Sequence, residues 1–224
     1  MSVITPFKRR GLMKNQASIF TVILLICFSV IVSGCAVGFY KGRPSDKAKI
    51  EELKDELARL REAKSLLEDR LSSEIASDKV QLNMEDRGLV ITFVAEVLFN
   101  SGKADLKPEG EGILKKVARV LKQEVSGNDI GVEGHTDNDP IKYSGWKSNW
   151  ELSTARATSV LHYLVDSGSL DPENLSATGY GEYRPVASNA TDKGKQKNRR
   201  VEIIIKPLPD AKITHQASDS DYIK

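Results

Sequence analysis

Cysteine is scarce in this chain: among its 224 residues only Cys27 and Cys35 are cysteines, and both lie inside the first long apolar run. No disulfide can therefore link the later parts of the chain, which must rely on a hydrophobic core. Histidine is also scarce, and His135, His162 and His215 lie far apart with no cysteine near them. Structural zinc sites need clustered Cys and His ligands, so the sequence predicts neither a metal site nor a cofactor.

Acidic residues are missing from the start of the chain, where none precedes Asp46. Four bases, Lys8, Arg9, Arg10 and Lys14, precede the long apolar run. The whole chain has a net charge of +2, and without these four bases it has 29 bases against 31 acids, a net charge of −2. The basicity belongs to the N-terminal segment alone, which excludes nucleic acid as a partner on electrostatic grounds.

Charge of either sign is absent from residues 15–40, and Ile19 to Val32 is densely apolar. A basic flank before such a run directs a chain to a membrane. The run is long enough to span a hydrocarbon core of about 30 Å, and its centre also fits a cleavable signal core. Residues 1–34 are therefore predicted to be a signal peptide or a membrane anchor. Under both interpretations the basic residues stay in the cytoplasm and the remainder lies in the periplasm.

The residues Val32-Ser33-Gly34-Cys35 resemble the lipobox of bacterial lipoproteins. That resemblance implies cleavage before Cys35 and lipidation of its thiol, with Ala36 after it favouring an outer-membrane lipoprotein that faces the periplasm. The alternative is that Gly34 and Cys35 are small residues of a single transmembrane helix, which would be held in the inner membrane.

Residues 35–45 are rich in Gly, Pro and Ser and are predicted to be a linker. Residues 46–84 are predicted to form a coiled-coil helix, because apolar residues recur at three- and four-residue steps and Lys64 takes the one polar position. The alternative is an amphipathic helix that packs on its own domain, but such helices usually have a wider apolar stripe. The narrow seam predicts a homo-oligomer, and its apolar members are Ile50, Leu53, Leu57, Leu60, Leu67 and Leu71.

Strands and helices alternate in residues 86–207, which are predicted to form one domain. Strands are expected at 88–94, 97–99, 129–134, 175–179 and 200–205, and a helix at 106–125. Ser148 and Glu151 have capping-box spacing, so a second helix should begin near Asn149 and stop at Gly168. Its core face is expected to carry Trp150, Ala157, Leu161 and Leu164. The fold class is an α/β (α+β) two-layer sandwich of order β-α-β-α-β-β, with both helices on one sheet face and a flexible tail at 208–224.

Four motifs in this domain resemble those of the OmpA-like peptidoglycan-binding domain, over about residues 88–206. They are Gly134-His-Thr-Asp137, Asn149-x-x-Leu152-Ser153-x-x-Arg156-Ala157, Gly179-Tyr-Gly181 and Asn198-Arg-Arg-Val-Glu202. The stretch Ser148-Asn-Trp-Glu-Leu-Ser153 is most similar to the branch of this family that contains the flagellar stator protein MotB. The membrane-directed segment and the predicted coiled coil lie outside the resemblance.

The resemblance implies that the domain binds the free end of diaminopimelate in a peptide stem. Asp137 would accept hydrogen bonds from the ammonium, and Arg156 would hold the carboxylate through its planar fork. Asn149 and Leu152 share a helix face with Arg156 and would form one wall. Phe99, Asn100 and Thr136 complete the predicted site, although the family usually has Asp at the position of Asn100.

Each of these residues also has a purely structural interpretation. Asp137 can cap a turn, and Arg156 can be an ordinary surface ion-pair partner. One of Arg199 and Arg200 can pair with Asp137 or Glu202 without touching a ligand. His135 is interpreted as a core or turn histidine.

The predicted function is non-catalytic binding of peptidoglycan that tethers a bacterial membrane to the cell wall. One alternative is a MotB-like stator or a motor-associated scaffold. Coupling to ion flow needs an ionisable residue in the membrane, and residues 15–40 contain no Asp or Glu. A peptidoglycan-acting enzyme is a lesser alternative, because Asp137 and His135 stand two apart at a strand end, where their side chains diverge.

Overall fold

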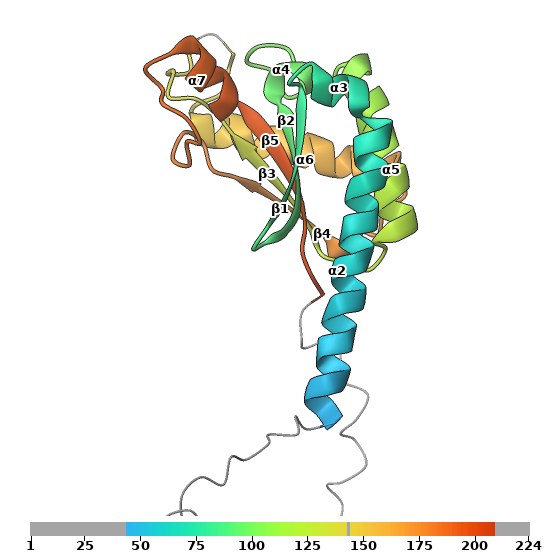
Figure 1. Cartoon of the computed structure of the whole chain (residues 1–224). Helices are drawn as coiled ribbons and strands as arrows, with labels where there is room; N and C mark the ends of the chain where they lie inside the picture. Colours follow the sequence, from blue (N-terminus) through green and yellow to red (C-terminus); the bar gives the residue numbers. More distant parts are fainter. Residues whose placement is uncertain (1–43, 143, 209–224) are drawn as a thin grey trace, which may run out of the picture. The chain divides into compact units, whose positions relative to one another are not determined.

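The computed structural model describes residues 44–142 and 144–208 (Figure 1). The predicted signal or anchor, the lipobox with Cys35, the linker as far as residue 43 and the tail from residue 209 lie outside the described residues. None of the described helices is both long and apolar enough to cross a membrane. The chain divides between Lys49 and Ile50, and the packing described below is that of the residues from Ile50 onward.

The first described helix, α2, spans Pro44–Arg70 and is followed by the short helix α3, Ser72–Ala76. Helix α2 begins at Pro44, inside the predicted linker, because proline is well suited to the first turn of a helix. The predicted coiled coil of residues 46–84 is wrong at its C-terminal end, where Val80–Glu85 forms strand β1. Asp78 has a positive φ of 54° and turns the chain between α3 and β1. Val80 is buried and Gln81 exposed, which is the two-residue alternation of a strand.

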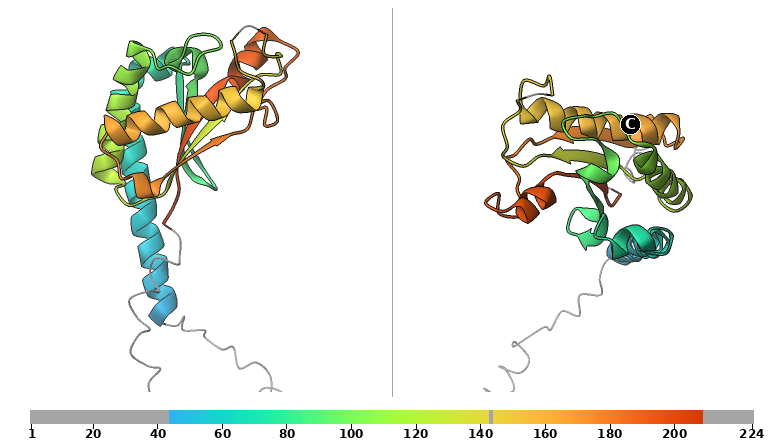
Figure 2. Two further views of the ribbon diagram at one scale, coloured as in Figure 1. Left: turned by 180° about the vertical axis from the view of Figure 1, so that it is seen from behind. Right: turned by 90° about the horizontal axis from the view of Figure 1, so that it is seen from above.

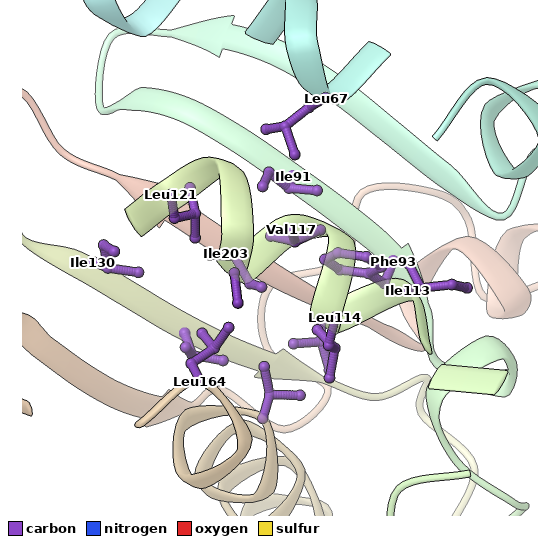
Figure 3. Close-up of a cluster of buried hydrophobic side chains, with 14 of the residues drawn as sticks. Leu67, Ile91, Phe93, Ile113, Leu114, Val117, Leu121, Ile130, Leu164 and Ile203 are labelled. Carbon is purple, nitrogen blue, oxygen red and sulfur yellow. The ribbon is translucent and has the colours of Figure 1, made fainter. Parts of the chain in front are cut away.

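The C-terminal half of α2 packs on its own domain. Leu60, Ala63, Leu67 and Leu71 are at most 2% exposed and belong to the same core cluster as the sheet. Figure 3 shows Leu67 directed at the side chains of the sheet and of helix α5. The intramolecular alternative therefore holds for this half, and Lys64 lies beside the stripe, where it pairs with Glu68.

The N-terminal half of the predicted seam is not covered in the same way. Ile50, Leu53 and Leu57 are 52%, 47% and 38% exposed. These three residues are the part of the seam that remains available for association between chains.

Five strands form one sheet in the order β1-β2-β5-β3-β4. The other strands are β2 (Gly88–Val94), β3 (Ile130–His135), β4 (Leu175–Gly179) and β5 (Arg200–Ile205). β3 and β4 are parallel, and the remaining neighbours are antiparallel. In this register His135 stands opposite Arg200, and Glu133 stands opposite Glu202.

Helices α5 (Pro108–Glu124) and α6 (Asn149–Asp166) cover one face of the sheet, as predicted. Their apolar stripes meet Ile91, Phe93 and Ile203 in a single core (Figure 3). The predicted two-layer order β-α-β-α-β-β is confirmed, with β1 added before it. A short helix α7 (Asp192–Asn198) lies on the other side of the sheet from α6 (Figure 2).

Two local predictions are wrong. The expected strand at 97–99 is a helical turn, α4 (Ala95–Leu98), and only Phe99 makes a bridge, with Leu106. Trp150 is 46% exposed rather than part of the core. The first turn of α6 extends past the ends of β3 and β4, so the loop at Gly181 lies beneath Trp150 in place of the sheet.

Candidate functional site

A cavity of about 470 Å³ opens where β3 ends, between the first turns of α6 and the segment from α4 to Lys103. The loop after β3 and Arg199, just before β5, complete its walls. All seven residues that the sequence predicts for the site line this one cavity: Phe99, Asn100, Thr136, Asp137, Asn149, Leu152 and Arg156.

Close packing of α6 on β3 positions the cavity. A Cβ at Gly134 would lie 2.0 Å from the carbonyl oxygen of Ser153, so only glycine allows this approach. Ser148 caps α6, its side chain accepting a hydrogen bond from the backbone N–H of Glu151 as predicted. The end of β3, with Asp137, is thereby held against the start of α6, with Asn149.

Asp137 is 6% exposed and carries one strong ion pair. Its Oδ2 accepts a hydrogen bond of 2.6 Å from Nη1 of Arg199, and its Oδ1 accepts one of 3.2 Å from the backbone N–H of Asp139. Nε of Arg199 donates at 2.6 Å to Glu96. Burial lowers the pKa of Arg199, but its bonds to Asp137 and Glu96 outweigh burial and raise that pKa.

The structural pairing expected of Arg199 or Arg200 is made by both residues. Arg199 pairs with Asp137, and Arg200 donates from Nε to Glu202 at 2.6 Å. Glu96, Arg199 and Asp137 form an alternating row of charges, called here the Glu96–Arg199–Asp137 triad.

Arg156 is a buried cation of a different kind, 5% exposed. Its Nε donates to the carbonyl oxygen of Lys103 at 2.9 Å, and its guanidinium lies over the ring of Phe99, 5.3 Å from the centroid. Within residues 44–142 and 144–208, no carboxylate lies within ion-pair distance of it. Burial lowers the pKa of Arg156 to about 10, and the nearby charge of Glu96 offsets only part of this effect. The cavity therefore exposes a positive charge without an anionic partner.

Thr136 and Asn149 organise the cavity wall. Thr136 donates from its hydroxyl to the carbonyl oxygen of Asp137 at 2.8 Å. Nδ2 of Asn149 donates to the carbonyl oxygen of Asp139 at 3.1 Å and to Oε2 of Glu182 at 2.7 Å. The donors of these two side chains therefore hold the loop after β3 and Glu182 in place.

Glu96 and Lys103 also line the cavity, and the sequence reasoning missed both. A signal for Glu96 existed, since it is the only charged residue between Gly88 and Phe99. Lys103 contributes its backbone carbonyl to Arg156, and sequence carries no signal for such a contact.

A second cluster lies on the face of the sheet away from α5 and α6. Ligand atoms of Glu133, His135 and Glu202 lie within 4.8 Å of one another, as in some metal sites. Arg87 already donates to Glu133 at 3.0 Å and pairs with Glu202, so a guanidinium takes the place a metal ion would need. His135 stacks on Tyr180 and is 1% exposed; burial lowers its pKa, in keeping with the predicted core histidine.

Comparisons with known proteins extend over the same residues. Residues 98–199 match the OmpA family. The chain is 40% identical over 148 residues to motility protein B of Bacillus subtilis (strain 168), which covers 66% of this chain and 56% of that protein. It is 35% identical over 122 residues to the outer-membrane lipoprotein YfiB of Pseudomonas aeruginosa, covering 54% of this chain and 69% of that protein. It thus spans under two thirds of the length of motility protein B.

Among solved structures, the cell wall anchor of the T6SS from Pseudomonas aeruginosa is similar in both fold and sequence. The TM-score is 0.58 and the identity 32%, over 63% of this chain and 97% of that chain.

Proposed function

We propose that this chain, which belongs to the OmpA family, binds peptidoglycan through the free end of diaminopimelate in a peptide stem and catalyses no reaction on it. One observation carries the proposal: Arg156 is a buried cation that faces a cavity without an anionic partner. Burying an unpaired charge is costly, so such a residue is retained where a ligand supplies the partner. A carboxylate matches the planar fork of arginine in two parallel hydrogen bonds.

Arg156 and the charges that act on it also match a zwitterion. The Glu96–Arg199–Asp137 triad contains two carboxylates and one guanidinium, a net charge of −1, and Arg156 adds +1. Asp137 accepts two hydrogen bonds, and a carboxylate has about four acceptor positions, so an ammonium has room beside Arg199. A ligand with one ammonium and one carboxylate satisfies both ends of the cavity at once.

The cavity walls favour binding over catalysis. A hydrolase would need a nucleophile beside a base, or two carboxylates with separated pKa values. The buried hydroxyl of Ser144, in the cavity wall, has no hydrogen-bond partner among the described residues. His135, the histidine closest in sequence to the cavity residues, packs on Tyr180 instead.

We further propose that the chain tethers a membrane of the cell envelope to the wall, with its domain in the periplasm. The similarity to an outer-membrane lipoprotein and to a cell wall anchor supports this, as does the charge-free run at residues 15–40. Lipidation of Cys35 would place the chain in the outer membrane, and an uncleaved segment would place it in the inner membrane. Gel mobility of a Cys35→Ala variant separates the two, because only a lipidated chain loses its processed form on this change.

Association through α2 is a separate proposal. Ile50, Leu53 and Leu57 follow three- and four-residue steps and are exposed, so pairing with a second copy would bury them. Leu53→Glu should shift residues 44–224 from oligomer to monomer in analytical ultracentrifugation. Arg61→Glu changes an exposed position of the same helix outside the seam and should leave the mass unchanged. A wild-type monomer at high concentration would refute the proposal.

The binding proposal is tested by retention on purified peptidoglycan. We expect wild type to bind the diaminopimelate type and not the lysine type, since lysine lacks the terminal carboxylate that Arg156 would hold. Arg156→Lys keeps the charge but loses the fork, and Asp137→Asn keeps the shape but loses the charge. Each should weaken binding at least about tenfold, because each removes a charge-assisted hydrogen bond.

Arg119→Met is the matched control, an exposed arginine of α5 that does not line the cavity. It should bind as wild type does, and circular dichroism should show all variants folded. Equal retention on both wall types would contradict the assignment of Arg156, and failure of wild type to bind either would contradict the function.

A scaffold in a motility apparatus is a second candidate, favoured by the 40% identity to motility protein B. It uses the same wall-binding cavity and differs in its partner. Deletion of the chain would then abolish swimming while leaving envelope integrity intact, whereas loss of a general tether would weaken the envelope.

A further inference from the structure

An exposed pair of aromatic rings lies beside the cavity. Trp150 and Tyr183 are 46% and 65% exposed, yet their rings stack, with centroids 5.1 Å apart and planes at 22°. Single exposed apolar side chains are common, whereas contiguous exposed apolar surface marks sites of interaction, ligand-binding grooves among them. The pair is called here the aromatic platform.

The aromatic platform is fixed to the cavity wall by specific contacts. Trp150 follows Asn149 in the chain, Tyr183 follows Glu182, and Asn149 donates to Glu182 at 2.7 Å. Gly181, between the two segments, has a φ of +54° and donates from its backbone N–H to Oγ of Ser153 at 2.9 Å. These contacts hold the aromatic platform next to the cavity wall.

We propose that the aromatic platform stacks a sugar ring of the glycan strand while the cavity holds the peptide stem. This inference rests on the proposed function and adds a second ligand class to it. A pyranose ring presents C–H groups on one face, and these pack on the apolar face of an indole or phenol ring. Tyr and Trp provide such contact at low conformational cost, because each has only two side-chain torsions.

The reach of the ligand agrees with this placement. In peptidoglycan the stem peptide is joined covalently to a sugar, and each residue of an extended peptide spans about 3.3 to 3.6 Å. A stem held in the cavity thus keeps its sugar within a few residue lengths. The Cα atoms of Asn149, in the cavity wall, and Trp150, in the platform, are themselves neighbours at about 3.8 Å.

The experiment compares two probes on the full chain in detergent by calorimetry. One is the free stem tripeptide that ends in diaminopimelate, and the other is the same tripeptide joined to its disaccharide. We expect wild type to bind the disaccharide form more tightly by roughly twofold to tenfold, the range of a single aromatic contact. Trp150→Ala and Tyr183→Ala should each remove this preference while leaving the affinity for the free tripeptide within about twofold.

Two further variants complete the design. Trp150→Phe keeps a ring and should retain part of the preference. Val186→Ala removes an apolar side chain that is 61% exposed and is not part of the platform, so it should behave as wild type does.

The outcomes separate this inference from the proposed function. Equal wild-type affinity for both probes overturns the platform and leaves the function standing. If Trp150→Ala and Tyr183→Ala weaken the binding of both probes equally, the inference is also overturned. The rings would then act through the shape of the cavity. Failure of wild type to bind either probe contradicts the proposed function itself.

Discussion

Replacing Arg156 with methionine should abolish ligand binding at little cost in stability. Burial lowers the pKa of Arg156 to about 10. At about 1.36 kcal/mol per pKa unit, this corresponds to roughly 3 kcal/mol of electrostatic cost in the ligand-free protein. Methionine removes that cost and fills much of the same space.

The substitution also removes favourable contacts. The hydrogen bond from Nε to the carbonyl of Lys103 contributes about 1.5 to 3 kcal/mol, and the contact with Phe99 about 0.5 to 2 kcal/mol. The free energy lost with these two contacts nearly offsets the free energy gained by removing the buried charge. The free energy of unfolding of Arg156→Met should therefore lie within about 1.5 kcal/mol of wild type.

Arg200 is a matched comparison, because it is also 5% exposed. It pairs with Glu202 at 2.6 Å on the face of the sheet away from the cavity. Breaking a buried pair costs about 3 to 5 kcal/mol, and the lower end applies here because Arg87 still bonds Glu202. Arg200→Met should thus be destabilised by about 3 kcal/mol, well beyond Arg156→Met.

The assay is urea unfolding of residues 50–224 followed by circular dichroism, with peptidoglycan retention measured on the same samples. Arg156→Met should unfold near the wild-type midpoint and fail to bind the wall. Arg200→Met should unfold at lower urea and, while folded, still bind it. A loss of stability in Arg156→Met as large as that in Arg200→Met would refute the reasoning, because Arg156 would then be a structural residue.

Three further predictions concern stability, each measured by the urea midpoint. Gly134→Ala should cost about 3 kcal/mol or more because its Cβ would collide with the backbone of α6, whereas Gly112→Ala, with nothing within 4 Å, should gain up to about 1 kcal/mol. Leu67→Ala should cost about 2 to 5 kcal/mol, and Leu53→Ala less than about 0.5 kcal/mol, since only the former is in the core. Burial raises the pKa of Glu133 and Glu202, but their hydrogen bonds and ion pairs outweigh burial and lower it. The stability that these two glutamates give is complete above about pH 4.5 and is lost as pH falls further, less steeply in Arg87→Met.

The sequence predicts most of the domain because local and long-range signals agree there. Ser148 supplies the cap of α6, and the apolar spacing that follows it supplies the buried stripe. The resemblance implies that Asp137 and Arg156 lie together, and both line the same cavity.

The environment of α2 cannot be read from its sequence. A stripe at three- and four-residue steps is the same whether a second chain or the chain's own sheet covers it. Leu60 and Leu67 are covered by the domain, while Leu53 of the same pattern remains exposed. Only the position of β1 and β2 decides this, and β1 lies within the segment predicted to be helical.

The error at Trp150 has a related cause. Helix spacing places Trp150 on the same face as Ala157, which is fully buried, but spacing does not say where the sheet ends. The strand under α6 ends before it reaches Trp150 and is followed by a loop. The indole ring of Trp150 therefore stacks on Tyr183 and does not enter the core.

The pairing already present in the cavity supports the proposed selectivity for a zwitterion. Arg199 is committed to Glu96 and Asp137, so it cannot turn to a ligand carboxylate without breaking two ion pairs. Arg156 can take the carboxylate at no such cost. A ligand that lacks the carboxylate would seal the cavity over Arg156 and leave its charge desolvated, which costs more than the lost contact alone. Under the proposed function we therefore expect the cavity to discriminate against lysine, through the penalty of an unpaired arginine as well as through the bond that diaminopimelate gains.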